Sequence, residues 1–307
     1  MKRRRARLAR RRRAAIVVLL IAFAVAVAAG ILIARGDRTP RPSRVPPRHA
    51  RSLPSATPPR VAQVPPAAAP AQPSASEHPA AVETAGPVGG ARLAIIIDDC
   101  GQWPDTEHGF IALPVALTLS VLPYVRYGAQ IARDADAAGK GVMLHLPMEP
   151  RSGIDPGAGR VTVAMDDAAI AKAVRDDLID VPLAAGVNNH EGSRATADDR
   201  VMRDVVAVLA ERHVFFVDSR TSAATVAERD ASAAGVPTAR RDVFLDDVAE
   251  VAATESQLRR AAALAKARGS AIAIGHPRPT TLLAVRALLP ELAGGGITLV
   301  LARDLVH

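Results

Sequence analysis

The stretch AIIIDDCG, residues 94–101, runs four apolar residues directly into two adjacent aspartates, a cysteine and a glycine. A short apolar run bounded by polar residues and glycine is typical of a buried strand in a parallel sheet. Asp98 and Asp99 would then stand side by side at the end of a strand, where their charges repel each other. A divalent metal would offset that repulsion, with one carboxylate as its ligand and the other as a base, whereas a helix cap or a turn would need no metal.

The rest of residues 91–307 alternates short apolar runs with amphipathic helical patterns. The runs cover residues 93–97, 115–121, 141–146, 186–188, 214–217, 271–274 and 297–301, and the helical patterns cover residues 127–139, 166–180, 198–213, 255–269 and 280–295. This alternation predicts one α/β domain with a parallel sheet, either a barrel or an open doubly wound sheet. In both architectures functional residues collect at the carboxyl ends of the strands.

The first 34 residues have the composition of a membrane anchor. Nine of residues 1–13 are Lys or Arg, and residues 14–34 contain no charged residue, which is long enough for a helix that crosses a bilayer. The basic flank predicts a single-pass inner-membrane protein with a cytoplasmic N-terminus and a periplasmic domain. A cleaved secretory signal is the alternative, because small residues near the end of the segment offer a cleavage site.

Residues 35–90 are predicted to be a disordered linker rich in proline and alanine. Residues 37–90 hold 13 of the 24 prolines and show no apolar periodicity, so this segment buries too little surface to fold.

Residues 91–307 contain 28 acidic residues against 23 Lys and Arg. The basic character of the chain therefore comes from its N-terminal part, and no nucleic-acid partner is predicted for the domain.

Polar side chains follow several of the predicted strands. LHLPMEP, residues 144–150, places His145 and Glu149 four residues apart, a pair that suits zinc or a similar metal if the segment turns helically. The alternative is a partly buried core histidine. GVNNHEGS, residues 186–193, adds Asn188, Asn189 and His190, which is more polar functionality than a turn requires.

Three further stretches bring acids, arginines and a histidine to the same predicted edge. FFVDSRT, residues 215–221, carries Asp218 and Arg220, and RRDVFLDD, residues 240–247, carries Asp242. Asp218 and Asp242 are candidates for holding a metal ligand or a catalytic histidine in orientation. AIAIGHPRPTT, residues 271–281, places His276 after a strand, where it suits a general acid.

Together these motifs resemble the divergent branch of the polysaccharide deacetylase superfamily. IIIDDCG, HLPMEP, GVNNHEGS, FFVDSRT, RDVFLD and IGHPRPTT occur over residues 92–307 in the order of that branch. The resemblance implies a distorted (β/α) barrel of about seven strands. It also implies a divalent metal, zinc above all, and an N-acetylated envelope glycan such as peptidoglycan as substrate.

The resemblance also implies roles for individual residues. Asp98 would be the base and Asp99 a metal ligand, joined by His145. Glu149 stands where the superfamily has a second histidine, and either this carboxylate or the nitrogen of His190 would complete the metal ligands. His276 would protonate the leaving amine. Candidate substrate contacts are Asn188, Asn189, Asp218 and Arg220.

Two other functions stay open at this point. A deacetylase-like domain could bind a glycan or an envelope partner without turning it over, because a fold does not imply an activity. Glu149 in place of a histidine favours that alternative. A metal hydrolase acting on esters or phosphates is the other one, although the acidic balance of the domain disfavours phosphates.

Overall fold

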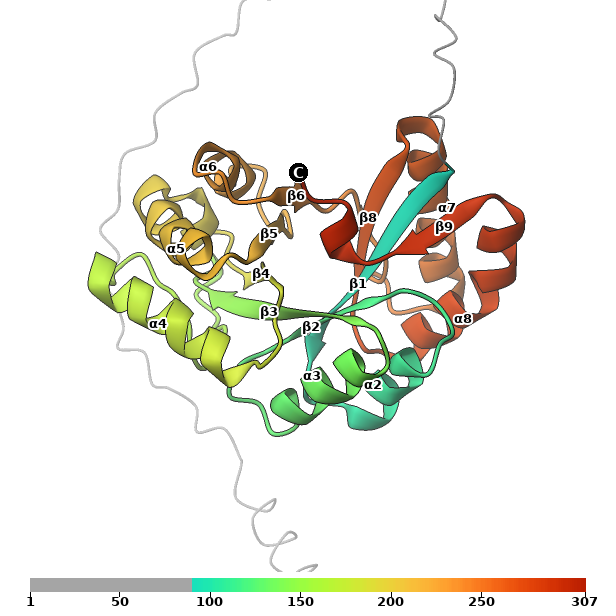
Figure 1. Ribbon diagram of the computed structural model, residues 1–307, viewed down its shortest axis with the longest axis horizontal. Helices are drawn as coiled ribbons and strands as arrows, with labels where there is room; N and C mark the ends of the chain where they lie inside the picture. The colour runs from blue at the N-terminus through green and yellow to red at the C-terminus, as the bar shows by residue number, and fades with distance from the viewer. Residues whose placement is uncertain (1–89) are drawn as a thin grey trace, which may run out of the picture. The chain divides into compact units, whose positions relative to one another are not determined.

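The computed structural model describes residues 90–307, and the predicted basic tail, membrane segment and nearly all of the predicted linker lie outside these residues. The described part is an α/β domain built on one curved parallel sheet, with its helices on the outer face (Figure 1). Within residues 90–307 no helix combines the length and the apolar character needed to cross a membrane.

The sheet contains nine strands, all paired in parallel. They are β1 (Ala91–Cys100), β2 (Thr118–Val121), β3 (Gly141–Met148), β4 (Gly186–Glu191), β5 (Phe215–Asp218), β6 (Thr238–Arg240), β7 (Val243–Phe244), β8 (Ser270–Gly275) and β9 (Ile297–Val300). Their order is β6-β5-β4-β3-β2-β1-β8-β7, and β9 pairs with β1. The carboxyl ends of the strands therefore meet at one edge.

Seven helices connect the strands. They are α2 (Pro104–Ile111), α3 (Gly128–Ala137), α4 (Asp167–Asp180), α5 (Asp199–Arg212), α6 (Ala227–Ala233), α7 (Val251–Arg268) and α8 (Pro279–Gly294). Local signals set several ends: Asp166 and Asp198 cap the N-termini of α4 and α5 with their carboxylates, and Gly269 ends α7 in the left-handed conformation. All five helical patterns expected from the sequence are present, and the short α2 and α6 are additional.

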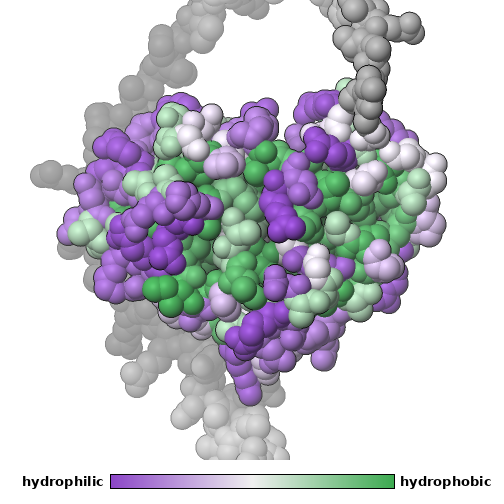
Figure 2. Space-filling model, viewed as in Figure 1, coloured by the Kyte–Doolittle hydropathy of each residue, from purple (hydrophilic) through white to green (hydrophobic). Residues whose placement is uncertain are grey.

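Side chains on the two faces of the sheet form two separate cores. The larger core lies between the sheet and the helices, and it includes Ile95 and Ile97 of β1. The alternate residues Ala94 and Ile96 face the inside of the curve, where they join a second cluster with Leu305 of the C-terminal segment. Figure 2 shows one face of the domain, with hydrophilic side chains over α5 and apolar side chains in the middle. The chain end thus fills the inside of the curved sheet.

The predicted barrel forms as a curved sheet that does not close by strand pairing. Its two edge strands, β6 and β7, are not paired with each other. Only Arg241 and Asp242 separate them, and their backbone N–H groups bond to Asp218 O of β5 and Ile272 O of β8. The chain itself therefore spans the opening. These two strands were not expected from the sequence, because three and two residues in a polar stretch leave no apolar pattern.

Asp177 of α4 is a buried acid without a hydrogen-bond partner among the described residues. Its side chain is fully buried, and neither carboxylate oxygen accepts a hydrogen bond of acceptable geometry. Gly159 packs so closely over it that a Cβ there would come within 2.3 Å of Oδ1. Burial raises the pKa of Asp177 to about 8 and outweighs the opposing effect of the nearby Tyr124 hydroxyl. The carboxylates of Asp180 and Asp176 contribute to the rise.

This acid should make the domain less stable as the pH rises from about 4 to about 8. The folded state holds the proton in that interval and the unfolded state releases it, so the unfolding free energy falls by about 1 kcal/mol per pH unit. Replacing Asp177→Asn is expected to remove this slope and to raise the melting temperature at pH 8. As the control, Asp176→Asn changes an acid paired with Lys172 at the surface and should leave most of the slope in place. A wild-type slope that persists in Asp177→Asn would contradict the assignment.

Candidate metal centre and active site

A bulge in β1 lets two adjacent aspartates face the same side of the sheet. Neighbouring residues of a regular strand point to opposite faces. Between Ile97 and Cys100, however, β1 contains one residue more than β2, and Asp99 takes a left-handed backbone with φ 57°. Both carboxylates consequently approach His145, with Asp99 Oδ1 at 3.2 Å and Asp98 Oδ2 at 3.6 Å from its Nε2 atom. The bulge is what brings both acids to one site.

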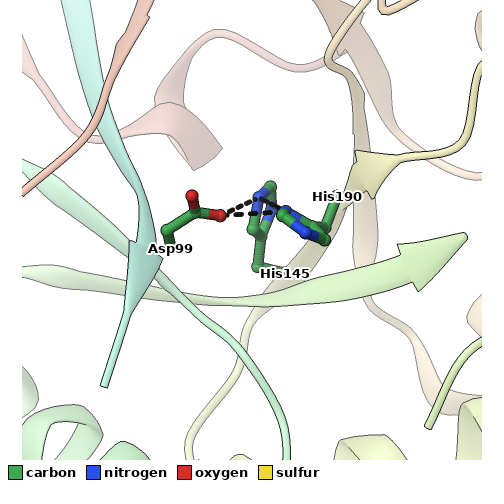
Figure 3. Close-up of side chains that lie close together, drawn as sticks. All are labelled: Asp99, His145 and His190. Carbon is green, nitrogen blue, oxygen red and sulfur yellow. Dashed lines mark hydrogen bonds and ion pairs between the residues drawn. The ribbon is translucent and has the colours of Figure 1, made fainter. Parts of the chain in front are cut away.

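Asp99, His145 and His190 point toward one another from β1, β3 and β4 (Figure 3). His190 Nδ1 lies 2.9 Å from Asp99 Oδ1 and 3.2 Å from His145 Nε2. Asp99 Oδ1 is buried and makes no hydrogen bond of acceptable geometry with any described residue, although both ring nitrogens are near. Three potential ligand atoms thus converge on one point.

This donor set fits a divalent metal such as zinc. Two imidazole nitrogens and one carboxylate oxygen are ligands that zinc uses, and such ligands lie about 3.4 Å apart around a tetrahedral ion. The three atoms here are separated by 2.9–3.2 Å. A carboxylate oxygen that is buried without a hydrogen bond gains the missing interaction when a cation binds. Asp99, His145 and His190 would hold the ion.

The side-chain amide of Asn188 fixes the orientation of His145. Asn188 Oδ1 accepts from His145 Nδ1 at 2.9 Å and from the Ser120 hydroxyl. Its Nδ2 atom donates to Asp98 Oδ1 at 2.8 Å and to Ser219 Oγ at 3.1 Å. With the proton of neutral His145 on Nδ1, the lone pair on Nε2 faces Asp99 and His190, as a metal ligand requires.

The environment separates the pKa values of the two aspartates. Burial raises the pKa of Asp98 and outweighs the opposing effects of His145, His276 and Asn188. Burial acts on Asp99 in the same direction, but close contacts with His145 and His190 prevail and hold its pKa well below the usual range. Asp99 therefore stays ionised, as a metal ligand would be, while Asp98 is more easily protonated. Two adjacent carboxylates with diverging pKa values are typical of a pair with different roles.

His145 itself shows that the site attracts positive charge. Burial lowers its pKa, but the charges of Asp98 and Asp99 more than compensate and raise it to about 9. Protons and a metal ion would therefore compete for Nε2, and metal binding should weaken in acid.

His276 stands across the site and is held by Asp246. The Nδ1 atom of His276 lies 2.9 Å from Asp246 Oδ1, and its backbone N–H donates to Oδ2 at 2.8 Å. Thr281 Oγ1 donates to the same Oδ2 at 2.6 Å. Burial lowers the pKa of His276, yet the hydrogen bond and charge of Asp246 outweigh this effect and raise it. His276 Nε2 is 3.8 Å from Asp99 Oδ2, so it faces the cluster of Asp99, His145 and His190.

These residues line a cleft of about 840 Å³ at the carboxyl edge of the sheet. Asp98, Asp99, His145, His190 and His276 all contribute to its wall. The geometry therefore combines a potential metal site, a carboxylate and a carboxylate-bound histidine around one accessible space, which is the set that metal-assisted hydrolysis uses.

The structure does not bring Glu149 to this cluster, which corrects the expectation from the sequence. Its carboxylate accepts from Arg194 Nη1 at 2.7 Å and from the Val163 N–H at 2.8 Å. The expected helical turn does not form, because β3 continues through Met148. Residues four apart along a strand are separated by about 13 Å, so Glu149 lies well beyond His145.

Four other predicted residues have different surroundings from those expected. Asn188 is fully buried in the network described above. Asn189 lines the cleft, but its Oδ1 atom accepts from the Ser219 N–H, so both amides brace the site. Asp218 accepts from the Arg220 N–H and the Thr225 hydroxyl, which orders the loop after β5. Asp242 accepts from the Ile272 N–H and pairs with Arg268. It does not orient a histidine; Asp246, four residues later, does. Arg220 lines the cleft as expected.

The comparison with known families agrees with this geometry. Residues 95–306 match the family model described as divergent polysaccharide deacetylase. The chain belongs to the divergent polysaccharide deacetylase family. It is 37% identical over 202 residues to an uncharacterized Haemophilus influenzae protein, an alignment covering 66% of this chain and 72% of the relative.

Two further proteins are similar to this chain. The uncharacterized Escherichia coli protein YibQ is 36% identical to this chain over 228 residues, an alignment that covers 74% of this chain and 71% of YibQ. The crystal structure of an uncharacterized Agrobacterium tumefaciens protein has a TM-score of 0.68 and 24% identity, and the match covers 72% of this chain and 91% of that one. The latter similarity concerns the fold.

Sequence reasoning did not assign roles to Ser120, Asp246 and Arg241. Ser120 follows no motif, and its contact with Asn188 arises only across two strands. Asp246 stands in RRDVFLDD, but β7 is too short to be recognised. The available signal was that Asp246 directly follows the apolar pair Phe244 and Leu245, as an acid at the end of a strand would.

The geometry predicts that the chain binds about one divalent ion. His190→Ala is expected to lower the affinity for zinc by more than about 100-fold, because it removes a ligand, and Asn188→Ala by about 10–100-fold, because it frees His145. Zinc titration of the full chain, followed by calorimetry, measures both effects. Glu149→Gln is the control and should keep wild-type affinity. A Glu149→Gln variant that loses zinc while His190→Ala retains it would overturn this ligand set.

Proposed function

We propose that this protein is a metal-dependent hydrolase that removes acetyl groups from an N-acetylated glycan of the cell envelope. The observation that carries the proposal is the convergence of Asp99, His145 and His190 beside Asp98, with His276 facing them. Membership in the divergent polysaccharide deacetylase family supports the glycan as substrate class.

Each residue has a role that its surroundings support. A divalent ion at Asp99, His145 and His190 would polarise the amide carbonyl and lower the pKa of water. Asp98, whose carboxylate is buried and held by Asn188, would accept the proton from the attacking water. Asp246 holds His276 by Nδ1, so that Nε2 would deliver a proton to the nitrogen of the leaving sugar amine.

The reaction balances as an amide hydrolysis. The water oxygen forms a bond to the acetyl carbon, and the bond from that carbon to the sugar nitrogen breaks. One proton passes to Asp98 and one from His276 to the nitrogen, so that acetate and a free amine leave. Proton transfer by a positioned side chain contributes about 10²–10⁴-fold to such a reaction.

Acetate release from N-acetylated glycans tests the proposal. With zinc present, the full chain is expected to release acetate from peptidoglycan fragments or chitooligosaccharides. His276→Ala and Asp98→Asn should each lower kcat by about 10²-fold or more, with zinc affinity largely retained. Zinc-loaded protein that binds a glycan without releasing acetate would support a binding domain instead and would contradict the proposal.

The pH dependence of kcat gives a further readout. Asp246 raises the pKa of His276, and a general acid works only while protonated. In Asp246→Asn the loss of kcat with rising pH should therefore begin at a lower pH than in the wild type. Thr280→Ser is a neighbouring control in the same loop-to-helix region, outside this hydrogen-bond network, and should leave the profile unchanged.

We place this activity outside the inner membrane as part of the same proposal. The 21 uncharged residues 14–34 and the nine basic residues before them support a single-pass anchor with a cytoplasmic N-terminus. Alkaline phosphatase fused after His307, which is active only outside the cytoplasm, should show activity in membranes. Replacing three of the basic residues, Arg3, Arg4 and Arg5, by Glu should reduce the phosphatase activity. An inactive wild-type fusion would refute the proposed location.

A further inference from the structure

Two arginines, Arg220 and Arg241, line the active-site cleft without a carboxylate partner among residues 90–307. Their neighbour Arg240 differs, because it lies at the surface and pairs with Glu228 at 3.3 Å. Arg260 and Arg278 line the same cleft. Guanidinium groups near each other repel, so an arrangement that leaves them unpaired is suited to an anion that comes from outside.

The loop that carries Arg220 is held in a strained conformation. Arg220 has a left-handed backbone with φ 55°, which costs about 1 kcal/mol or more for a residue other than glycine or asparagine. Asp218 Oδ1 accepts from the Arg220 N–H at 2.8 Å. Arg241 donates from Nε to Ser219 O at 2.7 Å and from Nη2 to Arg220 O at 3.1 Å. Arg241 thus fixes the backbone that presents Arg220 to the cleft.

Arg241 is held rigidly and still has donor capacity. Its guanidinium lies 5.0 Å from the centre of the Phe244 ring, and Phe244 contacts the His276 ring edge-on at 5.3 Å. Its Nη1 atom has no hydrogen-bond partner among the described residues. Arg241 and His276 therefore contact the same Phe244 ring.

The acids of the cleft are engaged elsewhere. Asp98 and Asp99 face His145, and Asp242 is paired with Arg268 and the Ile272 N–H. The remaining two, Glu191 and Asp247, are exposed to solvent. None of these five forms an ion pair with Arg220 or Arg241. Asp98, Asp218 and Asp242 lie near enough to favour the positive charge of Arg241, but none of them occupies its guanidinium nitrogens.

We propose that Arg220 and Arg241 bind an anionic substituent, a carboxylate or a phosphate, on the glycan whose acetamide enters the cleft. The inference rests on the proposed function for the identity of the glycan. The planar, multidentate donor geometry of arginine matches both anions. Arg241 and His276 contact the same Phe244 ring, and His276 is the proposed proton donor to the sugar amine. We therefore expect the anion on the sugar that carries this amine or on the sugar next to it. The preferred substrate is an acidic glycan rather than a neutral one.

Binding to matched probes tests this specificity. The full chain in chelating buffer is titrated with two pairs of probes. One pair is N,N′-diacetylchitobiose and the disaccharide of N-acetylglucosamine and N-acetylmuramic acid, and the other is N-acetylglucosamine and its 6-phosphate. We expect each anionic probe to bind about tenfold or more tightly than its neutral counterpart. The carboxylate and phosphate comparisons show which anion is preferred. Equal affinities in both comparisons would overturn the inference.

Three variants separate the arginine pair from bulk charge. Arg220→Asn removes the charge while keeping a residue that adopts the left-handed backbone easily, and it should abolish the preference. Arg220→Lys, which keeps the charge, should retain part of it. Arg240→Ala removes one charge outside the cleft and should have no effect. Loss of the preference in Arg240→Ala to the same extent as in Arg220→Asn would overturn the inference.

Acetate release keeps the two proposals distinguishable. Acetate released from neutral and acidic glycans at the same kcat/KM would sustain the proposed function and refute the anion preference. An anion preference that depends on Arg220, found in a chain that releases no acetate, would refute the hydrolase and sustain the anion site of a glycan-binding domain.

Discussion

The amide of Asn188 is the point at which five strands of the sheet meet. Asn188 stands in β4, and its amide bonds to four side chains: Asp98 of β1, Ser120 of β2, His145 of β3 and Ser219 directly after β5. All four of its hydrogen-bonding positions are used. A buried amide with four satisfied bonds is costly to displace, so this side chain determines where the carboxylate of Asp98 and the ring of His145 lie.

The site also depends on backbone strain at three strand ends. Asp99, Glu191 and Arg220 all have positive φ angles. Asp99 is one residue before the end of β1, Glu191 ends β4, and Arg220 follows β5 by two residues. Such conformations persist only where the surrounding structure compensates for them. At Asp99 the bulge turns a second carboxylate inward, and at Arg220 the contacts with Asp218 and Arg241 hold the loop. The strain is located where it changes the direction of functional side chains.

The sequence predicted the fold class well because apolar patterns report burial. All seven expected strands and all five expected helices are present, whereas β6 and β7 were too short and too polar to be recognised. The site was predicted in outline because residues after parallel strands share one edge. Glu149 and Asp242 show the limit of that rule. Glu149 bonds to Arg194 and Asp242 to Arg268, and spacing along the chain does not reveal such partners.

What the sequence by itself determined is the parallel α/β domain, its family and the edge at which Asp98, Asp99, His145, His190 and His276 would gather. The tertiary structure alone decided how these side chains lie relative to one another. A one-residue bulge puts both aspartates on one face, Asn188 selects the lone pair of His145, and Asp246 orients His276. These outcomes depend on contacts between strands that are far apart in the chain, and side-chain direction across such contacts is set by register and hydrogen bonding.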